Sequence, residues 1–83
     1  VYEYLAFYNR CFLDLDLHLL RLTRSLKALG IAVPMSEQSL QVVMHELVAR
    51  NGREDGGLYL QVSRGVARRD HAFPKQVKPA LVM

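Results

Sequence analysis

The sequence has a single cysteine, Cys11, and no long apolar run. One cysteine excludes an internal disulfide and is typical of a reducing compartment, so we expect a cytoplasmic protein with Cys11 as a small apolar filler beside Phe12. Charges interrupt every apolar stretch well short of the ~20 residues that a membrane span needs. We find no secretory signal pattern, with a basic start, an apolar run and a small-residue cleavage site, and we expect no membrane partner.

Several common chemistries also lack their residues. The three histidines and Cys11 show no spacing typical of a metal-ligand pair, so we predict no metal site. The glycines of "GREDGG" are accompanied by acids that would repel a phosphate, and no serine lies in a nucleophile elbow. Metal-dependent, nucleotide-binding and serine-hydrolase functions are therefore not predicted.

Positive charge is concentrated in one segment of the chain. Residues 64–78, called the basic loop from here on, hold five Lys or Arg and one Asp in a chain of net charge +3. The segment fits a solvated surface loop, a nucleic-acid patch or a trap for a small anion. A nucleic-acid surface usually shows a broad basic face with stacking aromatics, whereas only Phe73 accompanies these arginines. We therefore expect no nucleic-acid partner. A free-standing interaction domain that binds nucleic acid through the basic loop remains an alternative.

Within the basic loop, Arg69 and His71 are two residues apart. In an extended loop, both side chains would project to the same side. A guanidinium fork suits a carboxylate, and a neighbouring imidazole can donate a further hydrogen bond. Tyr2 can add a phenolic donor if the sheet brings it close. Solvation of all three side chains is an equally good interpretation of the pattern alone.

Hydrophobic periodicity predicts a strand, a turn and a helix in the first part of the chain. "VYEYLAFY" alternates with period two, residues 9–10 suggest a hairpin turn, and "CFL" returns as a second strand. We expect Asp16 to cap a helix that Gly30 ends. Its apolar stripe is expected to consist of Leu15, Leu19, Leu22, Leu26 and Leu29. Leu17 and Leu20 lie off this stripe, which suggests that a second domain or subunit covers them.

The second part of the chain predicts another helix and two more strands. Ser36 is expected to cap a helix that runs to about Arg50 and ends at Asn51-Gly52, with His45 at its surface. Its buried face is expected to consist of Leu40, Val43, Met44, Leu47 and Val48. "LYLQVSRGV" and "KPALVM" read as strands. This order predicts an α+β fold, with two helices packed on a mostly antiparallel sheet.

Three stretches of the sequence resemble a known protein family. "VYE" in a strand, "HLLRL" on the first helix and "LYLQVSRGVARRDHAFP" resemble the small N-terminal domain of D-amino acid aminotransferases. These are pyridoxal-phosphate enzymes of fold type IV, related to branched-chain aminotransferases and aminodeoxychorismate lyases. The resemblance covers practically the whole chain, and the R-x-H element at 69–71 favours the D-amino acid branch.

The resemblance implies roles for particular residues. Tyr2, Arg69 and His71 match the family's trap for the substrate α-carboxylate, and the Arg and His reach the neighbouring subunit's active site, which implies a homodimer. Arg21 matches the helix arginine that binds the cofactor phosphate. Arg64 matches a strand-end arginine, for which we infer only a structural role.

The resemblance also implies what this chain does not contain. The family's Schiff-base lysine lies in a larger C-terminal domain, and Lys27, Lys75 and Lys78 do not match it. Residues 1–83 are therefore interpreted as an N-terminal small domain that is inactive alone. The parent protein would transfer an amino group between a D-amino acid, such as D-alanine, and a 2-oxo acid, such as 2-oxoglutarate. A branched-chain aminotransferase or a lyase relative is the nearest alternative.

Overall fold

A computed structural model describes residues 1–83. Four strands and two helices follow in the order β1 (Tyr2–Tyr8), β2 (Cys11–Phe12), α1 (Leu15–Ala28), α2 (Glu37–Asn51), β3 (Gly56–Ser63) and β4 (Ala80–Val82). The strands form one antiparallel sheet in the order β2-β1-β3-β4. The predicted α+β class and the element order are confirmed. Neither helix is long and apolar enough to cross a membrane.

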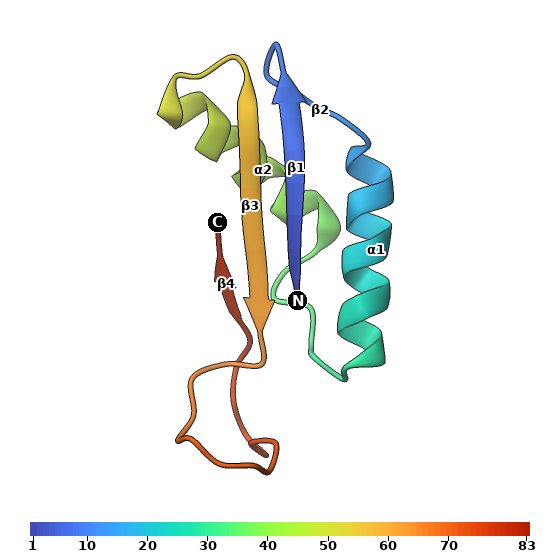
Figure 1. The fold of residues 1–83 in the computed structure, drawn as a ribbon, viewed down its shortest axis with the longest axis vertical. Helices are drawn as coiled ribbons and strands as arrows, with labels where there is room; N and C mark the ends of the chain where they lie inside the picture. Colours follow the sequence, from blue (N-terminus) through green and yellow to red (C-terminus); the bar gives the residue numbers. More distant parts are fainter.

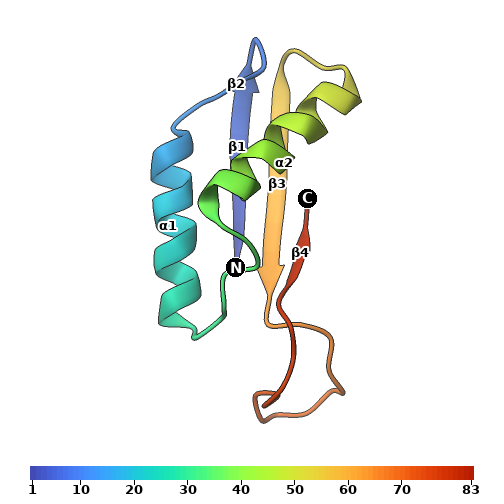
Figure 2. The ribbon, with the colours of Figure 1, turned by 180° about the vertical axis from the view of Figure 1, so that it is seen from behind.

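Both helices pack on one face of the sheet (Figures 1 and 2). Alternate residues of β1 and β3 point toward them, as the period of two predicts. α2 crosses behind the two long strands, while α1 lies along the β1 side. The buried apolar core consists of Leu5, Phe7, Leu19, Leu22, Leu26, Leu40, Met44, Val48, Leu58, Leu60 and Val62. The opposite face of the sheet carries exposed tyrosines.

The hairpin between β1 and β2 has a two-residue turn, as predicted. Tyr8 pairs with Cys11, and both Asn9 and Arg10 have positive φ, at 49° and 60°. Positive φ at both central residues defines a type I′ turn, which fits the strand twist but strains a residue such as arginine. The backbone N–H of Arg10 donates to the carbonyl of Glu54 at 2.8 Å, which helps to hold the turn. Cys11 is exposed beside this turn, so its prediction as a filler was wrong.

α1 begins two residues earlier than predicted. Asp14, not Asp16, is the N-cap residue, with φ 51° and no side-chain cap. The carbonyl of Asp14 accepts the first helical hydrogen bond from His18, and Asp16 lies in the first turn, where its charge favours the helix dipole. Leu29 is 53% exposed rather than buried, because the helix ends at Ala28 and Leu29 already leaves the helical path. Gly30 follows with φ 63°, as expected for the residue after a helix.

α2 matches its prediction closely at both ends. The Ser36 side chain accepts a hydrogen bond from the Ser39 N–H, and Gly52 closes the helix in the left-handed region. The buried face is narrower than expected, since Val43 is exposed and Leu47 only partly buried. A single row at i, i+4 and i+8 therefore carries the packing of α2 on the sheet. His45 is exposed, as predicted, with its ring centroid 5.1 Å from that of Phe12.

The basic loop leaves the sheet after β3, and the chain returns in β4. Ser63 pairs with Ala80, so the two ends of the excursion are joined by the sheet. The segment projects beyond the end of the packed body in both views (Figures 1 and 2). Strand β3 ends at Ser63, three residues before the end of the predicted strand.

Candidate functional site

A buried carboxylate organises the first candidate site. Glu3 faces the helices from β1 and is only 2% exposed, the one charged side chain in the core. Arg21 donates to it from Nε to Oε1 at 2.8 Å and from Nη2 to Oε2 at 2.5 Å. His18, one turn earlier on α1, lies with Nδ1 2.8 Å from Oε2. A buried charge is tolerated only when paired and hydrogen-bonded, and this carboxylate meets both conditions.

These contacts keep Glu3 ionised. The hydrogen bond from Arg21 holds the pKa of Glu3 below its ordinary value; burial opposes this, and the contact with His18 adds to it. The same carboxylate raises the pKa of Arg21. The ion pair therefore fixes both the charge and the direction of the arginine.

Arg21 nevertheless retains donor capacity toward solvent. Its side chain is 56% exposed, and Nη1 makes no hydrogen bond within the chain. Together with Asp14, Leu17 and His18, it lines a shallow surface hollow. The predicted phosphate contact fits a guanidinium anchored on one edge and open on the other. Asp14, on the rim of this hollow, would oppose a phosphate electrostatically.

Glu3 and His18 were not recognised as site residues from sequence. A signal for Glu3 was present, because a single acid alternates with Val1, Leu5 and Phe7 on one strand face. Such an acid is either exposed at a sheet edge or paired in the core. Its partners could not be identified from spacing alone, since they are 15 and 18 residues away along the chain.

Tyr2 lies on the open face of the sheet. Its ring stacks on Tyr59 of β3, with centroids 5.7 Å apart and planes at 24°. Tyr2 pairs with Gln61, two residues before β3 ends at Ser63. Tyr2 is therefore at the end of the sheet from which the basic loop departs (Figure 1).

The structure does not bring Tyr2, Arg69 and His71 into contact. Arg69 and His71 are exposed, and neither side chain hydrogen-bonds within the chain. The backbone bends at Arg69 and again at His71, so the alternation expected of an extended loop does not apply. The backbone N–H of His71 donates to Oδ1 of Asp70 at 2.7 Å. Both side chains are available to an anion, and their assignment to a carboxylate remains a prediction.

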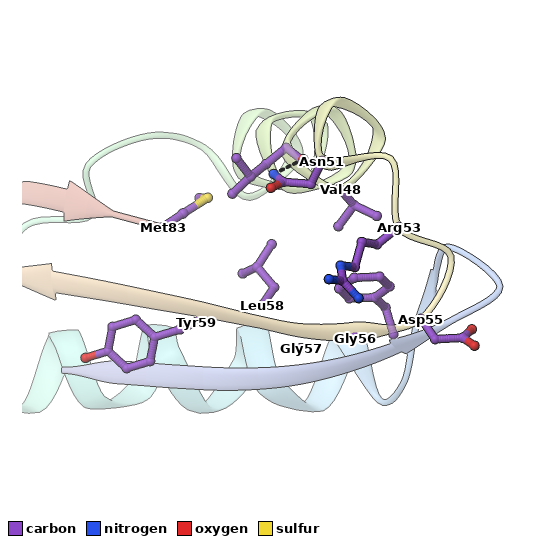
Figure 3. A pocket seen from close by; sticks show the side chains of 11 residues that line it. Val48, Asn51, Arg53, Asp55, Gly56, Gly57, Leu58, Tyr59 and Met83 are labelled. Carbon is purple, nitrogen blue, oxygen red and sulfur yellow. Dashed lines mark hydrogen bonds between the residues drawn. The ribbon is translucent and has the colours of Figure 1, made fainter.

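A cavity of about 590 Å³ lies away from all these residues (Figure 3). Leu58 and Val48 line its apolar wall between β3 and α2, Met83 lies at one end, and Arg53 and Asp55 lie at the other. It follows the part of β3 that β4 does not reach, because β4 pairs only with Gln61–Ser63. None of the predicted site residues lines it, so the cavity belongs to the sheet edge rather than to the candidate chemistry.

Comparison with known proteins gives one consistent result. The chain is 44% identical over 79 residues to the D-alanine aminotransferase of Bacillus licheniformis, which covers 95% of this chain and 28% of that protein. It is 37% identical over 83 residues to the D-alanine aminotransferase of Staphylococcus aureus (strain N315), covering 99% of the chain and 29% of that protein. A third relative, from Listeria monocytogenes serotype 4b (strain F2365), bears the same name and is 37% identical over 75 residues, covering 89% of the chain and 26% of that protein.

The chain thus spans less than a third of the length of the curated relatives it matches. The sequence model of one family, described as amino-transferase class IV, matches residues 1–83, the whole of the chain. The resemblance noted from the strand, helix and loop motifs is confirmed. The chain belongs to the class IV aminotransferase family.

Proposed function

We propose that this chain is part of a pyridoxal-phosphate-dependent transaminase that moves an amino group between a D-amino acid, such as D-alanine, and a 2-oxo acid, such as 2-oxoglutarate. The observation that carries the proposal is the 44% identity, over 95% of the chain, to a protein named D-alanine aminotransferase. Within the parent protein, residues 1–83 supply a site for the substrate carboxylate and a contact for the cofactor phosphate.

Arg69, His71 and Tyr2 form the proposed carboxylate site. The guanidinium of Arg69 binds both carboxylate oxygens through its paired N–H groups, the imidazole of His71 donates a further hydrogen bond, and the phenol of Tyr2 donates a third. Tyr2 is exposed near the end of the sheet from which the basic loop departs, and Arg69 and His71 are exposed within that loop, which supports this assignment. Because they make no contact within one chain, we propose that Arg69 and His71 act in the neighbouring subunit of a homodimer.

Arg21 is the proposed contact for the cofactor phosphate. Glu3 holds two of its nitrogens, so the third is directed without further loss of side-chain freedom. When bound, pyridoxal phosphate supplies the electron sink that the transfer requires. Residues of this chain orient the substrate and hold the phosphate.

The lysine that carries the cofactor is proposed to lie outside residues 1–83. Lys27 is on α1, and Lys75 and Lys78 are in the basic loop. None of these three lysines matches the Schiff-base lysine of the family. We therefore propose that the isolated chain has no transaminase activity. With pyridoxal phosphate, the isolated chain should show no cofactor absorption band that borohydride abolishes.

Replacement of Arg69 by alanine in the full-length protein tests the proposed function. We expect kcat/KM for D-alanine with 2-oxoglutarate to fall by the equivalent of about 2–4 kcal/mol, as for a lost charged hydrogen-bonded pair. Arg68→Ala is the matched control, because Arg68 is an exposed neighbour with no assigned role. Equal kinetics of the Arg69→Ala variant and the unaltered protein, within twofold, would sink the proposal.

A further inference from the structure

Arg64, the first residue after β3, makes three contacts at once. Its Nη2 donates to the carbonyl of Leu29 at 2.6 Å, and its Nη1 lies 3.3 Å from the carbonyl of Gly30. Its Cζ lies 4.4 Å from the centroid of the Phe73 ring. The guanidinium therefore joins the end of α1 to the far side of the basic loop.

The chemistry of each contact suits a guanidinium. The last carbonyls of a helix have no partner within the helix and carry partial negative charge. Leu29, the C-cap residue, presents a carbonyl at this end of the helix, and Gly30 presents the next one along the chain. The edge of a guanidinium donates to both of them together. The face of the same planar group is free to stack on an aromatic ring. A lysine ammonium can also lie over a ring, but it has no planar edge that donates to two carbonyls together.

The position of Phe73 in the chain determines which residues the contact with Arg64 encloses. Arg69 and His71 both lie between Arg64 and Phe73, so the stacking closes a sub-loop, residues 64–73, that contains both candidate carboxylate ligands. Phe73 is 77% exposed, and so the body of the protein does not hold it by burial. The contact with Arg64 ties this side of the basic loop to α1.

We infer that Arg64 is a positioning residue for the carboxylate site, which holds Arg69 and His71 by closing the 64–73 sub-loop against the end of α1. The inference rests on the proposed function. A sub-loop closed in advance spares the substrate the entropy of ordering it, so the contact should affect substrate binding more than turnover.

Steady-state kinetics of the full-length protein test this inference. We expect Arg64→Ala and Phe73→Leu each to raise KM for D-alanine roughly tenfold, with a smaller change in kcat. Phe73→Trp, which keeps an aromatic face, should remain within about twofold of the unaltered protein. A merely structural role would lower the fraction of folded protein and leave KM unchanged.

Limited proteolysis supplies a second readout that does not depend on activity. Phe73 variants retain every tryptic site of the basic loop, including the bonds after Arg68 and Arg69. We expect cleavage there to be several-fold faster in Phe73→Leu than in Phe73→Trp, because an open sub-loop is accessible to the protease for a larger fraction of the time. If Arg64→Ala fails to fold, the Phe73 pair decides the question alone.

The outcomes separate this inference from the proposed function. Unchanged KM and unchanged cleavage in folded Phe73→Leu protein would overturn the role of Arg64, whatever Arg69→Ala does. If Arg69→Ala is impaired in that case, the carboxylate site stands without the Arg64 contact. If Phe73→Leu is cleaved faster but neither it nor Arg69→Ala changes the kinetics, the sub-loop is closed as described but the proposed function fails, and the positioning role with it.

Discussion

The packed body and the basic loop of this protein are held in place by different kinds of interaction. In the body, Leu5, Met44 and Leu60 are fully buried, and the position of each follows from the period of its strand or helix. In the basic loop, Val66 is 92% exposed, and order comes from a few polar and aromatic contacts. The candidate carboxylate ligands lie in the region that packing constrains least, as is common for binding residues on a rigid scaffold.

The two regions also differ in whether their charged side chains are paired. Glu3 is buried and ionised because Arg21 and His18 satisfy its oxygens, so its charge serves to fix its partners. The side chains of Arg69 and His71 have no partner within the chain and remain free to bind an anion. Arg21 is thus paired with a buried carboxylate in the body, whereas Arg69 is unpaired where it is proposed to meet a substrate.

The largest difference in stability should come from the core. Leu60→Ala removes a fully buried side chain from the core face of β3, and we expect the free energy of unfolding to fall by about 2–5 kcal/mol. Val66→Ala in the basic loop should change it by less than about 0.5 kcal/mol. Denaturant titration of the full-length variants measures both. Equal effects would contradict the division into a packed body and an unpacked loop.

A smaller effect is expected when the buried charge is removed. Glu3→Gln keeps the shape of the side chain but weakens its hydrogen bonds to Arg21 and His18, and we expect a loss of about 1.5–3 kcal/mol. Glu46→Gln, which alters an exposed i, i+4 pair with Arg50, should cost at most about 0.5 kcal/mol. The same titration measures the two variants side by side.

The sign of the pH dependence follows from the lowered pKa of Glu3. The unfolded chain binds a proton near the ordinary value of 4.5, whereas the folded protein takes it up only at lower pH. The contribution of Glu3 is therefore complete above that value and is lost as pH falls through the folded pKa. Glu3→Gln should lack this part of the acid sensitivity. An unaltered profile in the variant would show that another group controls it.

Much of the fold could be predicted, because burial imposes a period on the sequence. The alternation of β1 and β3 and the cap at Ser36 are local signals, and the structure confirms them. The errors lie where local signals compete. Asp14 and Asp16 are the same residue type, and the helix begins after the earlier one, where Leu15 packs partly buried against the core. Cys11 was misplaced because a two-residue strand gives no period to follow.

The candidate site was less predictable, since its contacts join residues far apart in the chain. Resemblance to a family suggested Arg21, but the anchoring of its guanidinium by Glu3 needed the register of β1 against α1. Arg64 was expected to be structural only. Its link to the basic loop depends on how the chain returns to bring Phe73 over the guanidinium, which no spacing rule predicts.

An effect that links the two regions is expected at Gly65. It has φ 129°, and an added Cβ would collide with the carbonyl oxygen of Lys78 on the returning chain. Gly65→Ala should therefore cost about 1–3 kcal/mol through backbone strain and widen the base of the loop. Gly52→Ala is the control, since it also has positive φ but meets nothing within 4 Å. Only Gly65→Ala should accelerate tryptic cleavage after Arg68 and Arg69, because only that change pushes residue 65 away from Lys78 at the base of the loop. Equal cleavage of both variants would mean that this contact at the base does not control the loop.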